Sequence, residues 1–258
     1  MTDIHPTAIV DPKSEIAADV VIGPYAVIGA GVTVGEACRV GAHAVLEGPA
    51  RLGAHNVIHA FASIGSAPQD LKYGGEPTKL EIGSHNVIRE FTTLNRGTVG
   101  GGGTTRIGSH NLFMAYAHVA HDCVIGDRVV MANGATLAGH VTIEDFAIIG
   151  GLVAIHQHVR IGESAILGGG AMVSLDVPPY CMAAGDRATL RGLNLVGLRR
   201  RGMDEATLNA LRAAYRILFQ SGLRLADAVA RLRAELPGSR EVEHLAAFVS
   251  SSSRGICR

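Results

Sequence analysis

The chain has 258 residues, of which 47% are hydrophobic but only 4% aromatic, and it contains 33 glycines and no tryptophan. Its core must be built from Ile, Val, Leu and Ala. The chain is long enough for one sizeable domain or two unequal ones. The many glycines indicate many tight turns of the backbone. The formal net charge is zero, which gives no overall field to indicate nucleic acid or a membrane surface as a partner.

The beginning of the chain, MTDIHPTAIV, has neither the basic nor the apolar region of a signal peptide. The longest apolar run, FAIIGGLVAI, has ten residues and is too short to span a bilayer. Four cysteines, at positions 38, 123, 181 and 257, show no C-x-x-C spacing, which is typical of reduced thiols. We therefore expect a cytoplasmic protein without a membrane span.

An aliphatic residue recurs every six positions over most of the first 173 residues. The series runs from Ile4 to Ile64, resumes from Ile82 to Leu94 and, after slipping by one position, continues from Ile107 to Val173. A six-residue step turns an α-helix by about 600°, so these residues would not share a helical face. Hexapeptide repeats instead predict a parallel β-helix, in which the repeated residue points inward and three sides of six residues make one coil.

Two segments interrupt the repeat. Residues 66–80, SAPQDLKYGGEPTKL, and residues 95–106, NRGTVGGGGTTR, are rich in turn-forming residues and are predicted to protrude as loops. Loops on a rigid scaffold often carry function, although a merely tolerated insertion would have the same composition. The run of glycines does not predict a phosphate-binding loop, because no strand-to-helix context follows it.

The C-terminal part changes to a helical period after the rigid segment DVPPY, residues 176–180. Asp204 is a candidate N-cap for a first helix that ends near Gly222, and further helices are expected over 225–236 and 241–251. The predicted organisation is a β-helix over 1–185, with its two loops, followed by a small helical domain over 186–258.

Charge is distributed unevenly between these two parts. Residues 1–185 hold 10 Lys and Arg against 16 Asp and Glu, a net charge of −6, whereas residues 186–258 hold 13 Arg against 7 acids, a net charge of +6. A basic C-terminal domain favours an acidic partner. An ordinary solvated helical surface is the alternative.

Histidines and a carboxylate gather in the repeat around AYAHVAHDCVIGD, residues 115–127. Asp122, His140 and His158 are 18 residues apart, so they are expected to stack on successive coils, with His121 beside the base of the column. His118 directly precedes the inward-pointing Val119, and His156 lies two residues before His158. Together these residues predict a cluster of four or five imidazoles and one carboxylate on one outer face.

Three interpretations of this cluster remain open. It could be a solvated polar ladder, a Zn²⁺ site formed by neutral imidazoles, or a general base held by a carboxylate. For the Zn²⁺ interpretation, the comparison is with hexapeptide carbonic anhydrases, which have a histidine pair five residues apart. In this chain His118 and His121 are three residues apart and are followed by Asp122.

The chain also resembles, nearly end to end, the UDP-N-acetylglucosamine O-acyltransferase family. The matching segments are IHPTAIV, QDLKYGGEPT, NRGT, AHVAHD, TLAGH, FAIIGG, HQ, DVPPY and GLRRRG. The resemblance implies a mainly β protein with a left-handed parallel β-helix, assembled as a homotrimer with sites between subunits. It also implies transfer of a 3-hydroxyacyl group from acidic acyl carrier protein to the glucosamine 3-hydroxyl of UDP-N-acetylglucosamine, in lipid A synthesis. Such chemistry needs a base and an oxyanion donor, and we expect no metal or other cofactor.

The same resemblance assigns roles to individual residues. His121 matches the catalytic base, Asp122 is the neighbour that would orient its ring, and Gly139 matches the backbone N–H that stabilises the oxyanion. Residues matching substrate contacts are His140, Asp70 and Gln157 for the sugar, His118, Lys72 and His156 around the nucleotide and acyl donor, and Asn194, Arg200 and Arg201 for the nucleotide, where guanidinium groups suit phosphates. Gly169 matches the residue that ends the groove for the acyl tail.

Three positions depart from the family pattern: Asn95 and Arg187, where relatives carry His, and Val196, where an acidic residue is common. Two other functions are alternatives to this one. A related N-acyltransferase of the same pathway carries an extra N-terminal domain, for which hexads starting at Ile4 leave no room. A non-catalytic hexapeptide scaffold would need no aligned histidine and aspartate.

Overall fold

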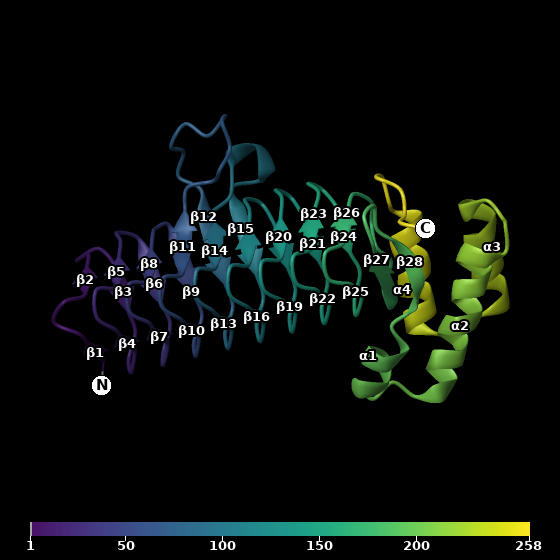
Figure 1. Cartoon of the computed structure of the whole chain (residues 1–258), viewed down its shortest axis with the longest axis horizontal. Helices are drawn as coiled ribbons and strands as arrows, with labels where there is room; N and C mark the ends of the chain where they lie inside the picture. The colour runs from purple at the N-terminus through teal and green to yellow at the C-terminus, as the bar shows by residue number, and fades with distance from the viewer. Residues whose placement is uncertain (1) are drawn as a thin grey trace.

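The computed structural model describes residues 2–258 and consists of a long three-sided prism of stacked coils with a group of helices at its C-terminal end (Figure 1). The strands form parallel sheets of 11, 9 and 8 strands, and each sheet makes one face of the prism. This arrangement confirms the predicted left-handed parallel β-helix. One strand, the last of the 11-stranded sheet, is antiparallel to its neighbour.

Each face is named here by its sheet. Face 1 contains β1 (Asp3–Ile4), β4 (Val21–Ile22), β7 (Arg39–Val40), β10 (Val57–Ile58), β13 (Val87–Ile88), β16 (Leu112–Phe113), β19 (Val130–Met131), β22 (Ile148–Ile149), β25 (Ile166–Leu167), β27 (Cys181–Ala184) and β28 (Thr189–Leu193). Face 2 contains β2 (Ile9–Val10), β5 (Val27–Ile28), β8 (Val45–Leu46), β11 (Ser63–Ser66), β14 (Thr93–Asn95), β17 (His118–Val119), β20 (Thr136–Leu137), β23 (Ala154–Ile155) and β26 (Met172–Val173). Face 3 contains β3 (Glu15–Ile16), β6 (Val32–Val34), β9 (Ala50–Leu52), β12 (Lys79–Ile82), β15 (Thr104–Ile107), β18 (Val124–Ile125), β21 (Thr142–Ile143) and β24 (Arg160–Ile161).

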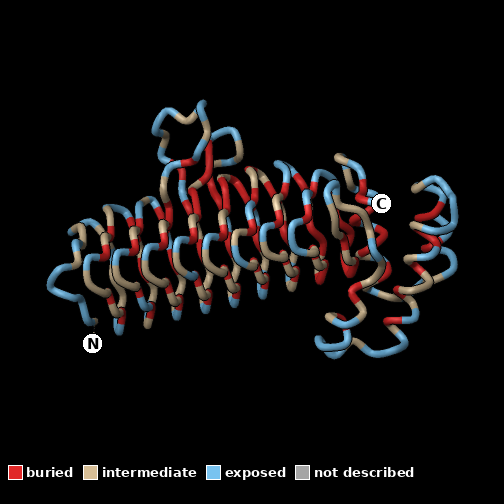
Figure 2. The backbone as a smooth tube through the Cα atoms, in the orientation of Figure 1, coloured by how far each residue is buried: buried red, intermediate tan, exposed pale blue. Residues whose placement is uncertain are grey.

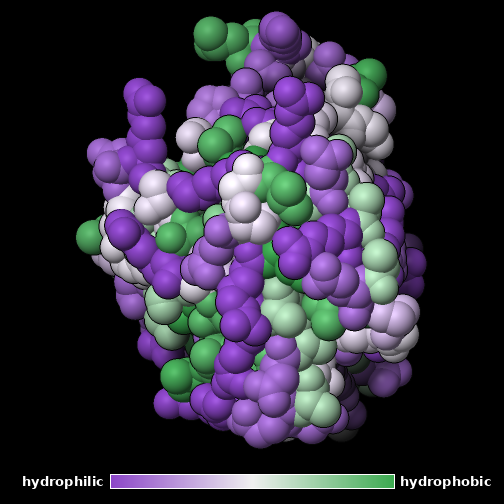
Figure 3. Space-filling model, turned by 90° about the vertical axis from the view of Figure 1, so that its right-hand side faces the viewer, coloured by the Kyte–Doolittle hydropathy of each residue, from purple (hydrophilic) through white to green (hydrophobic). Residues whose placement is uncertain are grey.

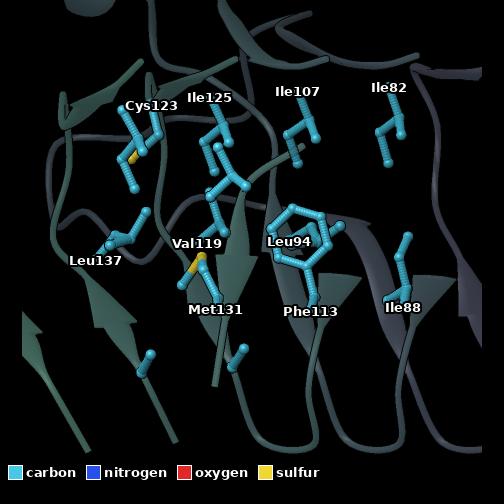
Figure 4. Packing of buried hydrophobic residues seen from close by; sticks show 14 of the residues in the cluster. Ile82, Ile88, Leu94, Ile107, Phe113, Val119, Cys123, Ile125, Met131 and Leu137 are labelled. Carbon is cyan, nitrogen blue, oxygen red and sulfur yellow. The ribbon is translucent and has the colours of Figure 1, made fainter. Parts of the chain in front are cut away.

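The repeated aliphatic side chains fill the inside of the prism. Leu94 and Val119 from face 2 and Phe113 from face 1 are fully buried, and Figure 4 shows them packed towards one another. Burial of this kind contributes roughly 1.5–3 kcal/mol per large side chain, and it is the main term that holds the coils together. Ile4 is an exception to the predicted pattern, because it lies in the first coil and is 42% exposed.

Three edges join the faces, and most turns at these edges contain a residue in the left-handed region. Examples are Tyr116 (φ 65°) at the edge between faces 1 and 2, His140 (φ 63°) between faces 2 and 3, and Phe146 (φ 60°) between faces 3 and 1. We call these edges 1/2, 2/3 and 3/1. Because this backbone conformation recurs in most coils, equivalent side chains stack along an edge.

The stacking is most regular on edge 1/2. Its exposed rings, with centroids about 5 Å apart, form one ladder of the side chains Tyr25, His43, Phe61, Phe91 and Tyr116.

The two predicted loops emerge side by side from the middle of the prism (Figure 1), and their tips are exposed (Figure 2). Strands β11, β12, β14 and β15 extend a few residues into the predicted loop ranges, so the loops themselves cover 67–78 and 96–103, the second including a short 3₁₀ helix, Val99–Gly101.

Strand pairing explains the slip in the repeat. Ile64 pairs with Leu94, 30 residues on, and Leu94 pairs with Val119, 25 residues on, whereas 18 is the usual separation, as for Val119 and Leu137. The first loop thus adds twelve residues and preserves the six-residue phase, and the second adds seven and shifts it by one.

A buried row of asparagines spans the coils that carry the loops. Asn56 Oδ1 accepts from Asn86 N–H (2.9 Å), Asn86 Oδ1 accepts from Asn111 N–H (2.9 Å), and Asn111 Oδ1 accepts from Val129 N–H (2.6 Å). The equivalent positions in the flanking coils, Cys38 and Val129, are apolar or weakly polar. These bonds fix the register of the coils across both interruptions.

The helices form a second core beyond the prism. They are α1 (Leu195–Arg200), α2 (Glu205–Gln220), α3 (Leu225–Glu235) and α4 (Arg240–Ser250). The N-cap prediction is confirmed, because the Asp204 carboxylate accepts from Thr207 N–H at 2.7 Å. Strand β28 and helix α1 were not predicted. No described helix is long and apolar enough to cross a bilayer, and all four cysteines are free and buried.

Helix α4 is attached to the prism by His244. Its Nε2 lies 3.0 Å from Glu144 Oε2, and its Nδ1 lies 2.9 Å from the Tyr180 hydroxyl and 3.6 Å from Glu163 Oε2. The hydrogen bond with Glu144, opposed by burial, raises the pKa of His244 above its ordinary value. Arg160 adds a second attachment by donating to the Phe248 carbonyl at 2.8 Å.

Candidate functional site

A histidine–aspartate pair occupies the turn between β17 and β18, on edge 2/3. His121 Nδ1 lies 2.8 Å from Asp122 Oδ2. Since a carboxylate only accepts, the ring donates from Nδ1 and its Nε2 is left unprotonated in the neutral tautomer. Among residues 2–258, no protein group is hydrogen-bonded to this Nε2. The His121 side chain is 16% exposed, so part of the ring faces the outside of the coil.

The Asp122 carboxylate differs from the prediction, because it does not lie on the outer surface. Loop 96–103 covers it, and its side chain has 0% exposure. Oδ1 accepts from Thr98 N–H (2.9 Å), and Oδ2 accepts from the Thr98 hydroxyl (2.6 Å) as well as from His121. Burial alone would raise the pKa of Asp122, but these hydrogen bonds and the nearby His140 outweigh it, and the pKa is lowered.

The backbone of Gly139 lies directly against the His121 ring. A Cβ placed on Gly139 would come within 2.5 Å of His121 Cε1, so no larger residue fits without moving the ring. Among the described residues its N–H donates to no acceptor. The site therefore combines an open imidazole nitrogen with an adjacent unpaired N–H.

The predicted column of histidines is present above the pair. His140 stacks on His158 with ring centroids 4.4 Å apart and meets His121 edge-on at 5.1 Å. Burial lowers the pKa of His140, although the charge of Asp122 opposes it. His118 lies on face 2, where Nδ1 is 2.6 Å from Thr93 Oγ1, and burial and the neighbouring His121 lower its pKa. Both rings are therefore biased towards their neutral form.

The other residues predicted near this edge are more exposed. Asp70 and Lys72 lie in loop 67–78, where the Asp70 carboxylate accepts from Lys72 N–H at 3.0 Å. Burial lowers the pKa of His140, and the charge of Asp70 opposes this lowering only weakly. His156 and Gln157 follow β23, and His156 Nδ1 is 3.1 Å from an Arg254 nitrogen. His156 thus turns towards the C-terminal segment rather than towards His121.

Two groups of predicted residues lie on other edges of the same chain. Arg201, at the end of α1, pairs with Glu163 at 2.9 Å and covers the Phe146 ring at 3.5 Å, which places it on edge 3/1. Exposed Arg200 precedes it. Asn194 is buried, and its amide caps α1 and donates to the Ser164 carbonyl (2.9 Å), so both of its polar atoms are used within the chain.

Gly169 lies on edge 1/2, in the turn between β25 and β26, and is exposed. Near that end of face 2 is a mostly apolar groove of about 340 Å³, whose lining includes Ala154, Met172 and Arg187. Met172 is 44% exposed.

The zinc interpretation can be tested against the donor set. One ligand atom each from His121, Asp122 and His140 lie within 4.8 Å of one another, the only such group among the described residues. However, the Asp122 oxygens already accept from Thr98 twice and from His121, and a metal would have to displace these bonds. This carboxylate fits the role of a hydrogen-bond acceptor better than that of a ligand.

Thr98 is a site residue that the sequence pattern does not predict. The only available signal was its place in the NRGT segment of the second interruption, and the loop's contact with Asp122 depends on the coil register that its own length alters.

Family models match much of the chain. A model described as UDP N-acetylglucosamine O-acyltransferase, domain 2, matches residues 176–257, and a model of bacterial transferase hexapeptide repeats matches residues 1–36 and 104–139.

Two relatives named acyl-[acyl-carrier-protein]–UDP-N-acetylglucosamine O-acyltransferase are similar over their whole length. The protein from Alkalilimnicola ehrlichii is 56% identical and that from Myxococcus xanthus 54% identical, each over 258 residues and 100% of both chains. Among solved structures, LpxA from Acinetobacter baumannii superimposes with a TM-score of 0.97 at 46% identity, over 99% of each chain. The UDP-N-acetylglucosamine acyltransferase of Arabidopsis gives a TM-score of 0.86 at 37% identity, over 99% of this chain and 100% of the other.

Proposed function

The chain belongs to the UDP-N-acetylglucosamine O-acyltransferase family, and from this we propose that it transfers a 3-hydroxyacyl group from acyl carrier protein to the glucosamine 3-hydroxyl of UDP-N-acetylglucosamine. This reaction is the first step of lipid A synthesis. The observation that carries the proposal is the juxtaposition of His121, held by a buried carboxylate, with the unpaired N–H of Gly139.

The reaction follows from these two groups. His121 Nε2 takes the proton of the sugar hydroxyl as its oxygen attacks the thioester carbonyl, and Asp122 stabilises the imidazolium that forms. The Gly139 N–H donates to the oxyanion of the tetrahedral intermediate. When the intermediate collapses, the carbon–sulfur bond breaks and the leaving sulfur takes the proton from His121. No group is consumed, so the site returns to its starting state.

The remaining residues bind the substrates. His140, Asp70 and Gln157 contact the sugar, and His118, Lys72 and His156 lie around the nucleotide and acyl donor. Arg200 and Arg201 bind the nucleotide phosphates, for which planar guanidinium groups are suited. Asn194 supports this end of the site by capping α1, as its internal hydrogen bonds indicate.

The acyl chain lies along the groove on face 2 and ends near Gly169. Because Gly169 has no side chain, the groove is open there, and we expect a longer acyl group to be accepted than after Gly169→Met. Competition between donors of two lengths measures this preference. An unchanged preference in a folded, active Gly169→Met protein would refute it.

The protein acts as a homotrimer with sites between subunits. His121 is on edge 2/3 and Arg201 on edge 3/1, so one chain does not bring them to the same site. The exposed ring ladder on edge 1/2 supports an interface between chains. Mixed trimers of His121→Ala and Arg201→Ala subunits should regain activity that neither has alone. Mixtures as inactive as their parents would place both residues in one subunit's site.

Acyl carrier protein, which is acidic, approaches the basic C-terminal domain in the cytoplasm. The helical end of the molecule has a largely hydrophilic surface (Figure 3), and Arg216 and Arg224 form no ion pair with any described residue. This surface suits an acidic partner that binds transiently.

The direct test is a product assay. The protein is mixed with 3-hydroxyacyl carrier protein and either UDP-N-acetylglucosamine or a 3-acylated glucosamine with a free amine, and the product mass is followed. We expect acylation of the first acceptor alone. Acylation of the amine would identify an N-acyltransferase, and no product from either would favour a scaffold protein.

A further inference from the structure

Loop 96–103 is built around the carboxylate of Asp122. Thr98 approaches it with two donors, its N–H at 2.9 Å from Oδ1 and its hydroxyl at 2.6 Å from Oδ2. Oδ2 is the same oxygen that accepts from His121, so Thr98 and the imidazole share one acceptor atom. The three side chains form a continuous row from Thr98 through Asp122 to His121.

The loop has room for this contact only because of its glycines. A Cβ on Gly101 would overlap the Asp122 carboxyl group, and one on Gly97 would come within 2.8 Å of Oδ1. The Gly101 N–H donates to Thr98 Oγ1 at 3.2 Å, which occupies that oxygen as an acceptor and leaves its proton for Asp122. Thr98 itself is only 8% exposed. The loop therefore excludes water from the carboxylate and replaces it with two fixed donors.

This arrangement has a consequence for His121. A buried carboxylate held only by the imidazole could rotate about its side-chain bond, and the ring would move with it. With Thr98 engaging both oxygens, the carboxylate plane is set, and the remaining direction at Oδ2 points to His121 Nδ1. A misplacement of about 1 Å of a catalytic group can lower a rate about 10²-fold.

We propose that Thr98 is a positioning residue that holds Asp122, and through it the base His121, in the orientation for proton transfer. This inference rests on the proposed function. It gives the second interruption of the repeat a role in catalysis, since the loop supplies Thr98, the third member of a hydrogen-bonded row with Asp122 and His121.

The first experiment replaces the hydroxyl without changing the side-chain volume. Thr98→Val should lower kcat roughly 10- to 100-fold, as expected for losing a hydrogen bond to a buried charged group. KM for UDP-N-acetylglucosamine should stay within about 3-fold, because Thr98 is buried against Asp122. Thr98→Ser, which restores the donor, should remain within about 3-fold of wild type in kcat. Thr98→Ala serves as a second deletion of the hydroxyl and should resemble Thr98→Val.

A double-mutant cycle separates positioning from general loop damage. If Thr98 acts through the carboxylate, Thr98→Val should slow the Asp122→Asn protein by less than about 3-fold, although it slows wild type by at least about 10-fold. A merely structural role would give the same loss in both backgrounds. Equal losses, or wild-type kcat in Thr98→Val, would overturn the inference.

The matched control is Thr92→Val. Thr92 is also buried, and its hydroxyl donates to the Met114 carbonyl at 3.3 Å, away from the pair. Its kcat should stay near that of wild type. His121→Ala separates the proposed base from the proposed positioning residue. Full activity in that variant would refute the role of His121 as the base. An inactive His121→Ala together with a normal Thr98→Val would refute the role of Thr98 alone.

Discussion

His121 and His244 are both paired with carboxylates, and their surroundings differ. His121 uses only Nδ1, towards Asp122, and the carboxylate is completely buried. His244 uses both nitrogens, Nε2 towards Glu144 and Nδ1 towards Tyr180, and the Glu144 side chain is 32% exposed. A histidine with both nitrogens engaged fastens two parts of the fold, whereas one with a free nitrogen can exchange a proton with a substrate. The pairing alone does not mark a catalytic base.

The largest expected effect tests this contrast directly. His121→Ala should lower turnover roughly 10²- to 10⁴-fold, the usual contribution of general acid–base catalysis. His244→Gln should leave turnover within about 3-fold, because its ring is used for attachment. Steady-state rates of both purified variants, with circular dichroism as a check on folding, measure the difference. Comparable losses in the two variants would remove the distinction.

A smaller effect is expected from the group that faces the free nitrogen. Gly139→Ala places a methyl group against the His121 ring, which must shift, and we expect a loss of about 10²-fold in kcat. Gly151→Ala is the matched control, because its Cβ would lie an ordinary 3.4 Å from the Asn133 carbonyl. A Gly139→Ala enzyme as fast as this control would show that the ring is not constrained there.

The smallest effect concerns pH and the attachment by His244. Its pKa is raised, so the folded protein binds this proton more tightly than the unfolded chain. The resulting stability is complete below the unfolded pKa and is lost as pH rises through the higher folded value. Because the pair is partly exposed, the loss between about pH 6 and pH 9 should lower Tm by at most about 4 °C. Thermal unfolding should show a flatter pH dependence in His244→Gln, and an identical slope would contradict the assignment.

The sequence predicted the repeated part of the molecule well because each coil obeys one local rule. A six-residue period specifies which side chain enters the prism, and an 18-residue spacing correctly placed His140 beneath His158. The position of Asp122 could not be predicted in the same way. Its burial depends on a loop whose path has no period, and the hydrogen bonds from Thr98 bridge 24 residues.

The C-terminal part shows the same limit. Amphipathic spacing predicted α2, α3 and α4 to within a residue or two at most ends. Strand β28 and helix α1 were missed because neither follows the six-residue repeat. Strand β28 is held by antiparallel pairing with β27, and α1 has only six residues and depends on its cap at Asn194. The expected boundary at residue 185 falls between β27 and β28, and it stays a prediction.

The buried asparagines have a consequence for how the chain folds. Parallel coils with nearly identical aliphatic residues could zip together one coil out of step, and the danger is greatest where loops lengthen the connection. The amide side chains of Asn56, Asn86 and Asn111 form their hydrogen bonds only when the coils pair in the correct register. In a shifted register the same amides would be buried without partners, which is costly. These hydrogen bonds therefore favour the correct pairing register of the coils, so that two successive insertions are tolerated.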